Sequence, residues 1–175
     1  NTHNDIIAVT SINNMSLITV EGNGILGRIG TASRVFNTVS DLNINIPFIT
    51  QASSETSICF AIDHINTDIA ISAIRENFIN EIKCCYIQNI NKILNTSLIT
   101  IIGSNMIKSP TVVGNIFSEL GKNNINIIAI SQGSSEISIT LVIHTSNEIN
   151  ALNIIHDFIS KNEERNNSKL SLGSE

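Results

Sequence analysis

The sequence predicts an α+β fold made of two βαββαβ units, with the first unit inserted into the second. Three observations lead to this prediction. The sequence repeats itself at an offset of 81 residues, and each copy shows the spacing of a strand, a helix, two strands and a helix. The strand that would close the second copy is found only at the N-terminus. A hydrophobic share of 42% in 175 residues is sufficient to bury such a core.

The repeat is visible in three segments. Leu17-Ile-Thr-Val-Glu-Gly22 returns as Leu98-Ile-Thr-Ile-Ile-Gly103, and Asn43-Ile-Asn-Ile46 returns unchanged at 124–127. Gln51-Ala-Ser-Ser-Glu55 returns as Gln132-Gly-Ser-Ser-Glu136. When residues 17–62 are aligned with 98–143 without a gap, 17 of 46 positions are identical. Identity at this level over one fixed offset indicates a duplication.

Both copies contain the same elements in the same order. A strand rich in β-branched residues is followed by a helix whose apolar residues recur at three and four positions. Two strands separated by a polar turn come next, and a second amphipathic helix ends the copy. The expected strands, helix, strands and helix are 16–22, 31–42, 44–50, 56–63 and 67–80 in the first copy, and 97–103, 111–122, 125–131, 137–143 and 147–160 in the second.

Each copy also needs a closing strand. The first copy has one at 84–92, whereas residues 161–175 contain too few apolar residues to pack, and we expect this polar tail to be disordered. The apolar stretch at 5–12 is therefore expected to complete the second sheet. The predicted units are residues 14–93, and residues 5–13 together with 94–160.

Pro47 agrees with this topology. A proline in a strand has no N–H to donate, so it is tolerated mainly at a sheet edge. In a ferredoxin-like βαββαβ sheet, with strand order 4-1-3-2, the second strand lies at an edge. Pro47 lies in that predicted strand.

The composition argues against several classes of function. Charged residues make up 14%, the net charge is -5 and aromatic residues make up 4%, so we expect no binding of nucleic acid. No apolar run reaches the roughly 18 residues of a membrane helix. Cys59, Cys84 and Cys85 have neither disulfide nor metal-ligand spacing, and they are expected to be reduced thiols. We expect a cytoplasmic protein, or one of a plastid or organelle lumen in a eukaryote, without a metal or cofactor.

The glycine-rich segment Gly22-x-Gly24-x-x-Gly27 follows a strand and precedes a helix, as in dinucleotide-binding proteins. The second copy keeps only Gly103, and no acidic residue follows the next strand to bind a ribose. A tight turn therefore explains the glycines better, and the N–H groups at the start of the helix can hold a small carboxylate. The same segment, as far as Arg28, resembles the acylphosphatase loop, so a small acylphosphatase-like enzyme is an alternative.

Gln51 and Gln132 occupy equivalent positions at the ends of the second strands. Each is part of a polar hairpin turn, or it offers a donor and an acceptor to a polar ligand beside the sheet. Asn45 and Asn126 are likewise ligand contacts or residues at the start of the strand. The sequence alone leaves both alternatives open.

Taken together, the strand that ends in glycine, the Asn-Ile-Asn-Ile segment and the paired Gln-x-Ser-Ser-Glu segments resemble the tandem ACT domains of aspartokinases. The closest resemblance is to the regulatory region of the bifunctional aspartokinase/homoserine dehydrogenases, over about residues 6–160. It implies an allosteric amino-acid-binding domain that mediates feedback inhibition by threonine, with lysine as the alternative effector. It also implies partners, namely the kinase domain of a parent protein and a second copy paired through ACT domains.

The resemblance also implies the residues that bind the effector. Gln51 and Gln132 match the glutamines assigned to threonine sensing. Further matches lie at the start of the second strand and around the first loop. They are Asn45, Ile46, Asn126, Ile127, Gly24, Ile29, Gly30 and Thr31.

A Lys-Phe-Gly-Gly type kinase motif is absent from the chain, and no dehydrogenase domain follows residue 160. We therefore expect no catalytic residues and no catalysis by this chain alone. The parent protein implied by the resemblance is an ATP-dependent aspartate kinase, fused or not to homoserine dehydrogenase. The chain is then an excised or a separately encoded regulatory region.

Overall fold

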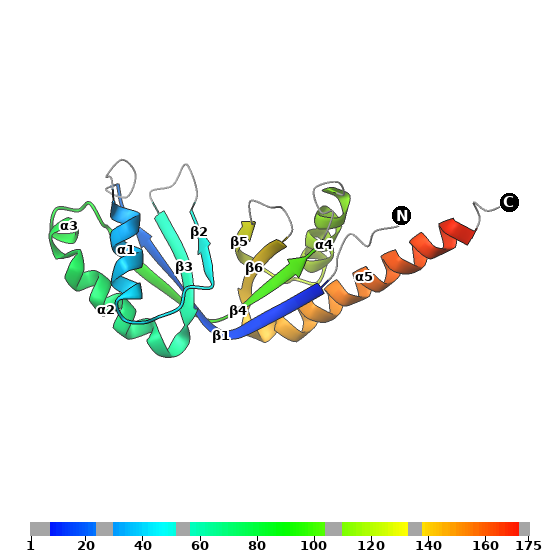
Figure 1. The fold of residues 1–175 in the computed structure, drawn as a ribbon, viewed down its shortest axis with the longest axis horizontal. Helices are drawn as coiled ribbons and strands as arrows, with labels where there is room; N and C mark the ends of the chain where they lie inside the picture. Colours follow the sequence, from blue (N-terminus) through cyan, green and yellow to red (C-terminus); the bar gives the residue numbers. More distant parts are fainter. Residues whose placement is uncertain (1–7, 24–29, 52–56, 104–109, 133–137, 172–175) are drawn as a thin grey trace. The chain divides into compact units, whose positions relative to one another are not determined.

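A computed structural model describes residues 8–23, 30–51, 57–103, 110–132 and 138–171. The chain divides into two compact units. Residues 13–96 form one of them, called the inserted unit below, and residues 1–12 with 97–175 form the other, called the split unit. Figure 1 shows the elements of both units with their labels.

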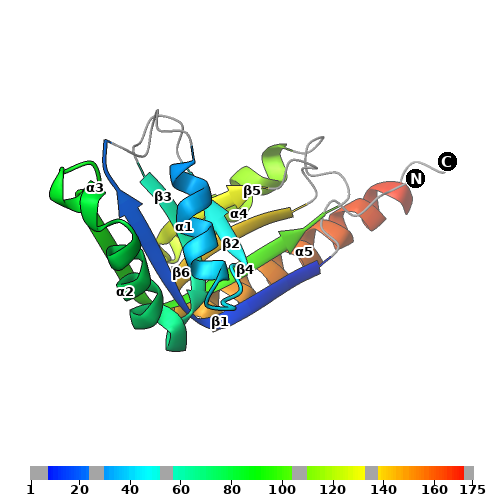
Figure 2. The same cartoon turned by 60° about the vertical axis from the view of Figure 1, so that its left-hand side comes forward.

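The inserted unit is a four-stranded antiparallel sheet with its helices on one face (Figure 2). Its strand order is β2-β3-β1-β4, the order of a ferredoxin-like βαββαβ fold. Its elements are the C-terminal part of β1 (Ala8–Glu21), α1 (Thr31–Ser40), β2 (Phe48–Thr50), β3 (Ser57–Asp63), η1 (His64–Asn66), α2 (Thr67–Asn77), α3 (Ile79–Lys83) and the N-terminal part of β4 (Asn89–Ile102).

The split unit repeats this arrangement with the strand order β1-β4-β6-β5. The N-terminal part of β1 closes its sheet, and Val9 packs against its core. The predicted insertion of one βαββαβ unit into another is therefore confirmed. The elements of this unit that follow β4 are α4 (Pro110–Lys122), β5 (Ile127–Gln132), β6 (Ser138–His144), η3 (Thr145–Asn147) and α5 (Glu148–Ser171).

Each unit has its own apolar core between its sheet and its helices. In the inserted unit Ile18, Phe60 and Ile74 are fully buried, and the rings of Phe36 and Phe60 meet edge to face at 6.0 Å. In the split unit Leu141 and Ile155 are fully buried in the corresponding place. Leu17, Phe48 and Ala61, on the opposite sheet face, are buried as well, which agrees with the β-branched runs that predicted these strands.

The strands predicted at 5–12 and 16–22 are one continuous strand, β1, and the strand predicted at 97–103 is continuous with the closing strand as β4. Asn14 and Asn95, which are equivalent in the repeat, have φ of 56° and 55°. Asparagine tolerates this left-handed conformation better than most residues. The left-handed residue lets each strand change direction without ending.

Other bounds differ from the expected ones. β2 covers three residues rather than 44–50, because Pro47 precedes it and has no N–H for a ladder bond. The strand expected at 84–92 begins at Asn89, and the helix expected over 67–80 divides at the buried Phe78 into α2 and α3. Residues 161–171, which we expected to be disordered, continue α5, and their Glu, Arg and Lys residues have a high helix propensity.

Candidate ligand-binding site

The two glutamines lie at the ends of the edge strands. Gln51 directly follows the last residue of β2, and Gln132 is the last residue of β5; both side chains are exposed. Thr50 lies opposite Cys59, and Gln132 lies opposite Ile139. The structure thus gives both glutamines the same position in their units, at an accessible corner of the sheet.

The direction of the glutamines follows from the strand alternation. Ile49 pairs with the core residue Phe60, and Ile130 pairs with the core residue Leu141, so both isoleucines face the helix side of their sheets. Gln132 lies two residues after Ile130 in the same strand, so it shares that face, and Gln51 follows Ile49 at the same interval. Each glutamine therefore belongs to the side of the sheet that the helices cover.

The N-terminus of α1 supplies the second part of the site. Gly30 precedes the helix with φ of 89°, and its carbonyl accepts the first helical hydrogen bond from Arg34 N at 2.9 Å. Gly30 has no side chain with which to cap the helix. The first-turn N–H groups carry a partial positive charge, which suits a carboxylate. Gly24 and Ile29 lie outside the described residues, as does the loop before α4.

The strand register places this helix terminus and Gln51 at one end of the inserted unit. Glu21, the last residue of β1, lies opposite Ser57, and Thr50 lies opposite Cys59 in the same strand, β3. The loop after Glu21 leads to Gly30 and to Thr31, which is 8% exposed. The structure therefore brings Gln51 and the start of α1 to the same end of the sheet.

Asn45 and Asn126, in contrast, lie at the other end. They precede β2 and β5 and are exposed, whereas Ile46 and Ile127 pack against the two cores. Six residues of extended chain separate Asn45 from Gln51, a span of about 20 Å. Within one unit, one ligand the size of an amino acid cannot contact both the asparagine and the glutamine.

A short row of small, uncharged residues crosses the opposite face of the sheet from each glutamine. In the inserted unit Thr19 Oγ1 donates to Cys59 Sγ at 3.4 Å, and Thr50 lies opposite Cys59. In the split unit the hydroxyls of Thr100 and Thr140 lie 2.9 Å apart, and Ser131 lies opposite Thr140.

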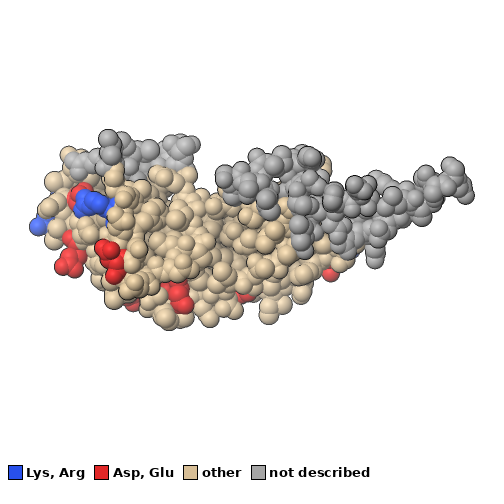
Figure 3. Space-filling view, in the orientation of Figure 1, with Lys and Arg blue, Asp and Glu red and all other residues tan. Residues whose placement is uncertain are grey.

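Burial raises the pKa of the Cys59 thiol above its ordinary value, although the hydrogen bond with Thr19 lowers it. The thiol is therefore neutral at physiological pH, and this row carries no charge. Charged side chains are also few on the face drawn in Figure 3.

The described residues contain no group of three His, Cys, Asp or Glu side chains that could hold a metal ion. Among the same residues, no helix is both long and apolar enough to cross a membrane. Arg28, on which the acylphosphatase-like alternative depends, is outside the described part of the chain.

Two repeats of one fold, each with a glutamine at the end of its edge strand, define a tandem α+β protein of two ferredoxin-like units. The family model described as "ACT domain" matches residues 18–78 and 99–158, one match in each unit. The chain belongs to the ACT domain family.

A curated relative is the chloroplastic bifunctional aspartokinase/homoserine dehydrogenase 2 of Arabidopsis thaliana. It is 39% identical over 153 residues, which are 86% of this chain and 17% of the relative. The chain therefore spans about a sixth of the length of this relative.

Solved aspartokinase structures share the fold. The aspartate kinase of Clostridium acetobutylicum superposes with a TM-score of 0.78 at 22% identity, over 90% of this chain and 36% of that chain. The regulatory subunit of aspartate kinase from Thermus thermophilus gives a TM-score of 0.70 at 18% identity, over 87% and 97%.

Sequence reasoning missed one group of polar residues. Arg34, Asn77 and Glu81 join α1 to α2 and α3. One feature of the sequence could have drawn attention to this group. The two copies differ there, since Asn115 occupies the position of Arg34 in the second copy.

Proposed function

We propose that the chain is the amino-acid-sensing regulatory region of an aspartate kinase fused to homoserine dehydrogenase, and that threonine is its effector. The observation that carries the proposal is the glutamine at the same corner of both units, which in the inserted unit is the end of the sheet where α1 begins after Gly30. The name of the Arabidopsis relative supports the parent enzyme, and the Thermus regulatory subunit supports a regulatory role for this fold.

Different groups at this corner can bind the carboxylate, the ammonium and the hydroxyl of threonine. The first-turn N–H groups of α1 bind the carboxylate, and backbone carbonyls bind the ammonium. The amide of Gln51 or Gln132 exchanges hydrogen bonds with the hydroxyl. Millimolar to micromolar affinity corresponds to about -4 to -8 kcal/mol, which a handful of such bonds can supply.

Edge pairing with a second copy would complete the site. β2 and β5 are edge strands. If the same edge strand of two copies pairs antiparallel about a twofold axis, the start of the strand in one copy lies beside its end in the other. Asn45 and Ile46 of one copy would then lie near Gln51 of the other, which resolves their separation within a single unit. Pro47 must fall at a position that donates no ladder bond.

Inhibition follows if the effector binds one arrangement of paired units better than another. A coupling free energy of about 1–3 kcal/mol is typical of such linkage. The chain itself then performs no catalysis, and the kinase domain of the parent protein responds. A parent protein in the cytoplasm or a plastid is part of this proposal.

Calorimetric titration of the chain with L-threonine and with L-lysine tests the proposal. We expect threonine to bind with a Kd in the millimolar to micromolar range and lysine to bind more weakly. Tighter binding of lysine would assign the alternative effector. Absence of binding by both, together with hydrolysis of acetyl phosphate, would replace the sensor with an acylphosphatase-like enzyme.

A further inference from the structure

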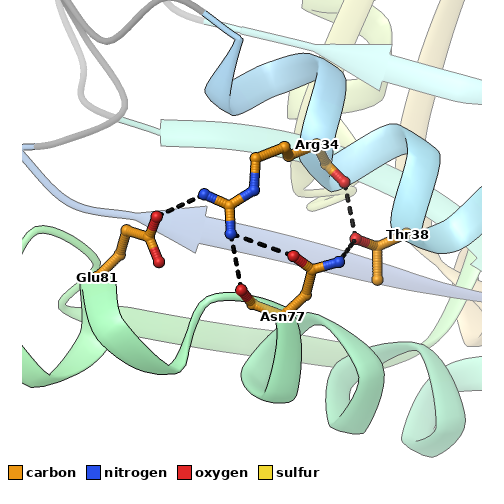
Figure 4. Close-up of polar contacts among 4 residues, drawn as sticks. All are labelled: Arg34, Thr38, Asn77 and Glu81. Carbon is orange, nitrogen blue, oxygen red and sulfur yellow. Dashed lines mark hydrogen bonds and ion pairs between the residues drawn. The ribbon is translucent and has the colours of Figure 1, made fainter.

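A polar clamp joins the first and second helices of the inserted unit (Figure 4). The guanidinium of Arg34 on α1 donates to Glu81 Oε1, to the Asn77 carbonyl at 2.7 Å and to Asn77 Oδ1 at 3.1 Å. It also lies 4.2 Å from the centre of the Phe78 ring. Asn77 in turn donates to Thr38 Oγ1 at 2.9 Å. One guanidinium thus satisfies a carboxylate, an amide and an aromatic ring at once.

The split unit has a pocket of about 490 Å³ at the equivalent place, between α4 and α5. The offset of 81 residues, which relates η1 to η3 and the starts of α2 and α5, makes Asn115 the counterpart of Arg34. Glu119 is the counterpart of Thr38, and Phe158 is that of Asn77. All three line the pocket, together with Asn123, Ile154, Asp157 and Lys161.

The lining of the pocket offers the kinds of group that the clamp uses, at other positions of the repeat, since Ile159 and Asn162 stand at the positions of Phe78 and Glu81. Carboxylates come from Glu119 and Asp157, a ring comes from Phe158, and an amide comes from Asn115. A planar cation placed among these groups meets the same kinds of partner that Arg34 has in the inserted unit. The volume lies within the range of about 300–1,000 Å³ that is usual for ligand pockets.

Two lysines lie in or next to the pocket, since Lys122 pairs with Glu119 and Lys161 is part of the lining. Lys122 Nζ lies 2.8 Å from Glu119 Oε1, and this hydrogen bond and charge lower the pKa of the Glu119 carboxyl, with a smaller effect from Lys161. Glu119 is therefore ionised at neutral pH, and its side chain is 40% exposed. Lys161 is exposed where it lines the pocket, and it competes with an incoming cation for the carboxylates. Neither lysine carries the planar, forked donor set of a guanidinium.

We propose that the pocket between α4 and α5 receives an arginine side chain from a partner polypeptide, as the clamp of the inserted unit receives Arg34 from its own helix. The sheet side of both helices is apolar, since Ile116, Leu120 and Ile155 are buried in the core. The polar pocket therefore belongs to the outer side of the helices, where another chain can reach it. The pocket lies apart from the corner that carries Gln132.

Titration followed by NMR of the backbone amides tests this docking site in the 175-residue chain. The probe is N-acetyl-L-arginine N′-methylamide, and its uncharged isostere N-acetyl-L-citrulline N′-methylamide is the matched control. We expect the arginine probe to shift the amides of α4 and α5 with a Kd in the millimolar range, and the citrulline probe to leave them unchanged. Equal shifts with both probes, or shifts only outside α4 and α5, would overturn the proposal.

Substitutions of the charged residues that line the pocket show whether it binds a cation or an anion. Glu119→Gln and Asp157→Asn should each weaken binding of the arginine probe by about twofold to fivefold, because each removes one exposed ion pair. Lys161→Ala should tighten it by a similar factor, since it removes the competing cation. Weaker binding by Lys161→Ala, with unchanged binding by the two carboxylate variants, would show an anion site instead.

Asn115→Arg gives α4 the arginine that the first copy has at the equivalent position of α1, Arg34. We expect this variant to lose binding of the arginine probe and to raise Tm by about 2–4 °C, as a clamp that forms within the chain should. Unchanged probe binding by this variant would contradict the proposal. Free L-arginine that binds more tightly than the capped probe would also overturn it, by showing a site for the amino acid itself.

Discussion

At the scale of single residues, Gly22 allows a close approach of the backbone at Tyr86 and Ile87, which the glycine-rich motif around it does not indicate. The motif Gly22-x-Gly24-x-x-Gly27 suggested a phosphate-binding turn, but a Cβ atom on Gly22 would lie 2.1 Å from the Tyr86 carbonyl oxygen and 2.7 Å from Ile87 Cα. Gln88 N also donates to Glu21 O at 2.8 Å beside it. Gly22 is required because the chain before β4 passes against it.

Gly22→Ala should therefore destabilise the protein by about 1–3 kcal/mol, because backbone atoms must move to admit the methyl group. Gly114→Ala is the matched control, since Gly114 lies inside α4 and a Cβ atom added there would have nothing within 4 Å. This second substitution should stabilise by about 0.4–1 kcal/mol. Thermal or urea unfolding measures both changes. Equal stability of Gly22→Ala and the parent chain would show that the close approach is not a constraint.

At the scale of elements, the repeat predicts the order of strands and helices well, and local irregularities account for the differences. The β-branched runs in Leu17–Gly22 and its copy identified buried strands, because such side chains are favoured in strands and are buried there. Residues 5–12 and 16–22, like 84–92 and 97–103, were predicted as separate strands, and Asn14 and Asn95 lie between them. A left-handed residue within a strand has no sequence signal that distinguishes it from a turn. The bounds of β1 and β4 therefore required the structure.

Asn95 tests this account of the long strands. Its φ of 55° is unfavourable for a β-branched residue, so Asn95→Val should cost about 1–2 kcal/mol, whereas Asn95→Gly should be nearly neutral. Asn91→Val, at another exposed position of β4, should change stability by less than about 0.5 kcal/mol. Urea unfolding of the three variants gives the comparison. A valine at 95 that is tolerated as well as one at 91 would rule out the left-handed conformation.

The candidate site was predictable from sequence only in part. The positions of Gln51 and Gln132 follow from the repeat, because a duplicated amide at the end of a strand keeps its place in the fold. The position of Gln51 at the end of the sheet where α1 begins depends on strand register, which the sequence alone does not determine. The pocket between α4 and α5 arises from side chains of two helices whose packing the apolar pattern leaves open.

At the scale of the whole molecule, the two units are not independent. Each unit has its own core, yet β1 and β4 both contribute to the two sheets, so the units share two continuous strands. A ligand bound at one edge strand therefore acts on a sheet whose other strands continue into the second unit. Under the proposed function, this continuity is the structural basis on which we expect effector binding in one unit to affect the other.

The central claim is that paired glutamines bind an amino acid, and calorimetry with L-threonine on three variants tests it most directly. Gln51→Ala and Gln132→Ala each remove a side-chain hydrogen bond worth about 0.5–1.5 kcal/mol, so affinity at the altered site should fall by up to about tenfold with Tm unchanged. Gln88→Ala, which removes another exposed amide, should bind threonine as the parent chain does. If both Gln51→Ala and Gln132→Ala retain full affinity, the glutamines are ordinary turn residues and the account is wrong.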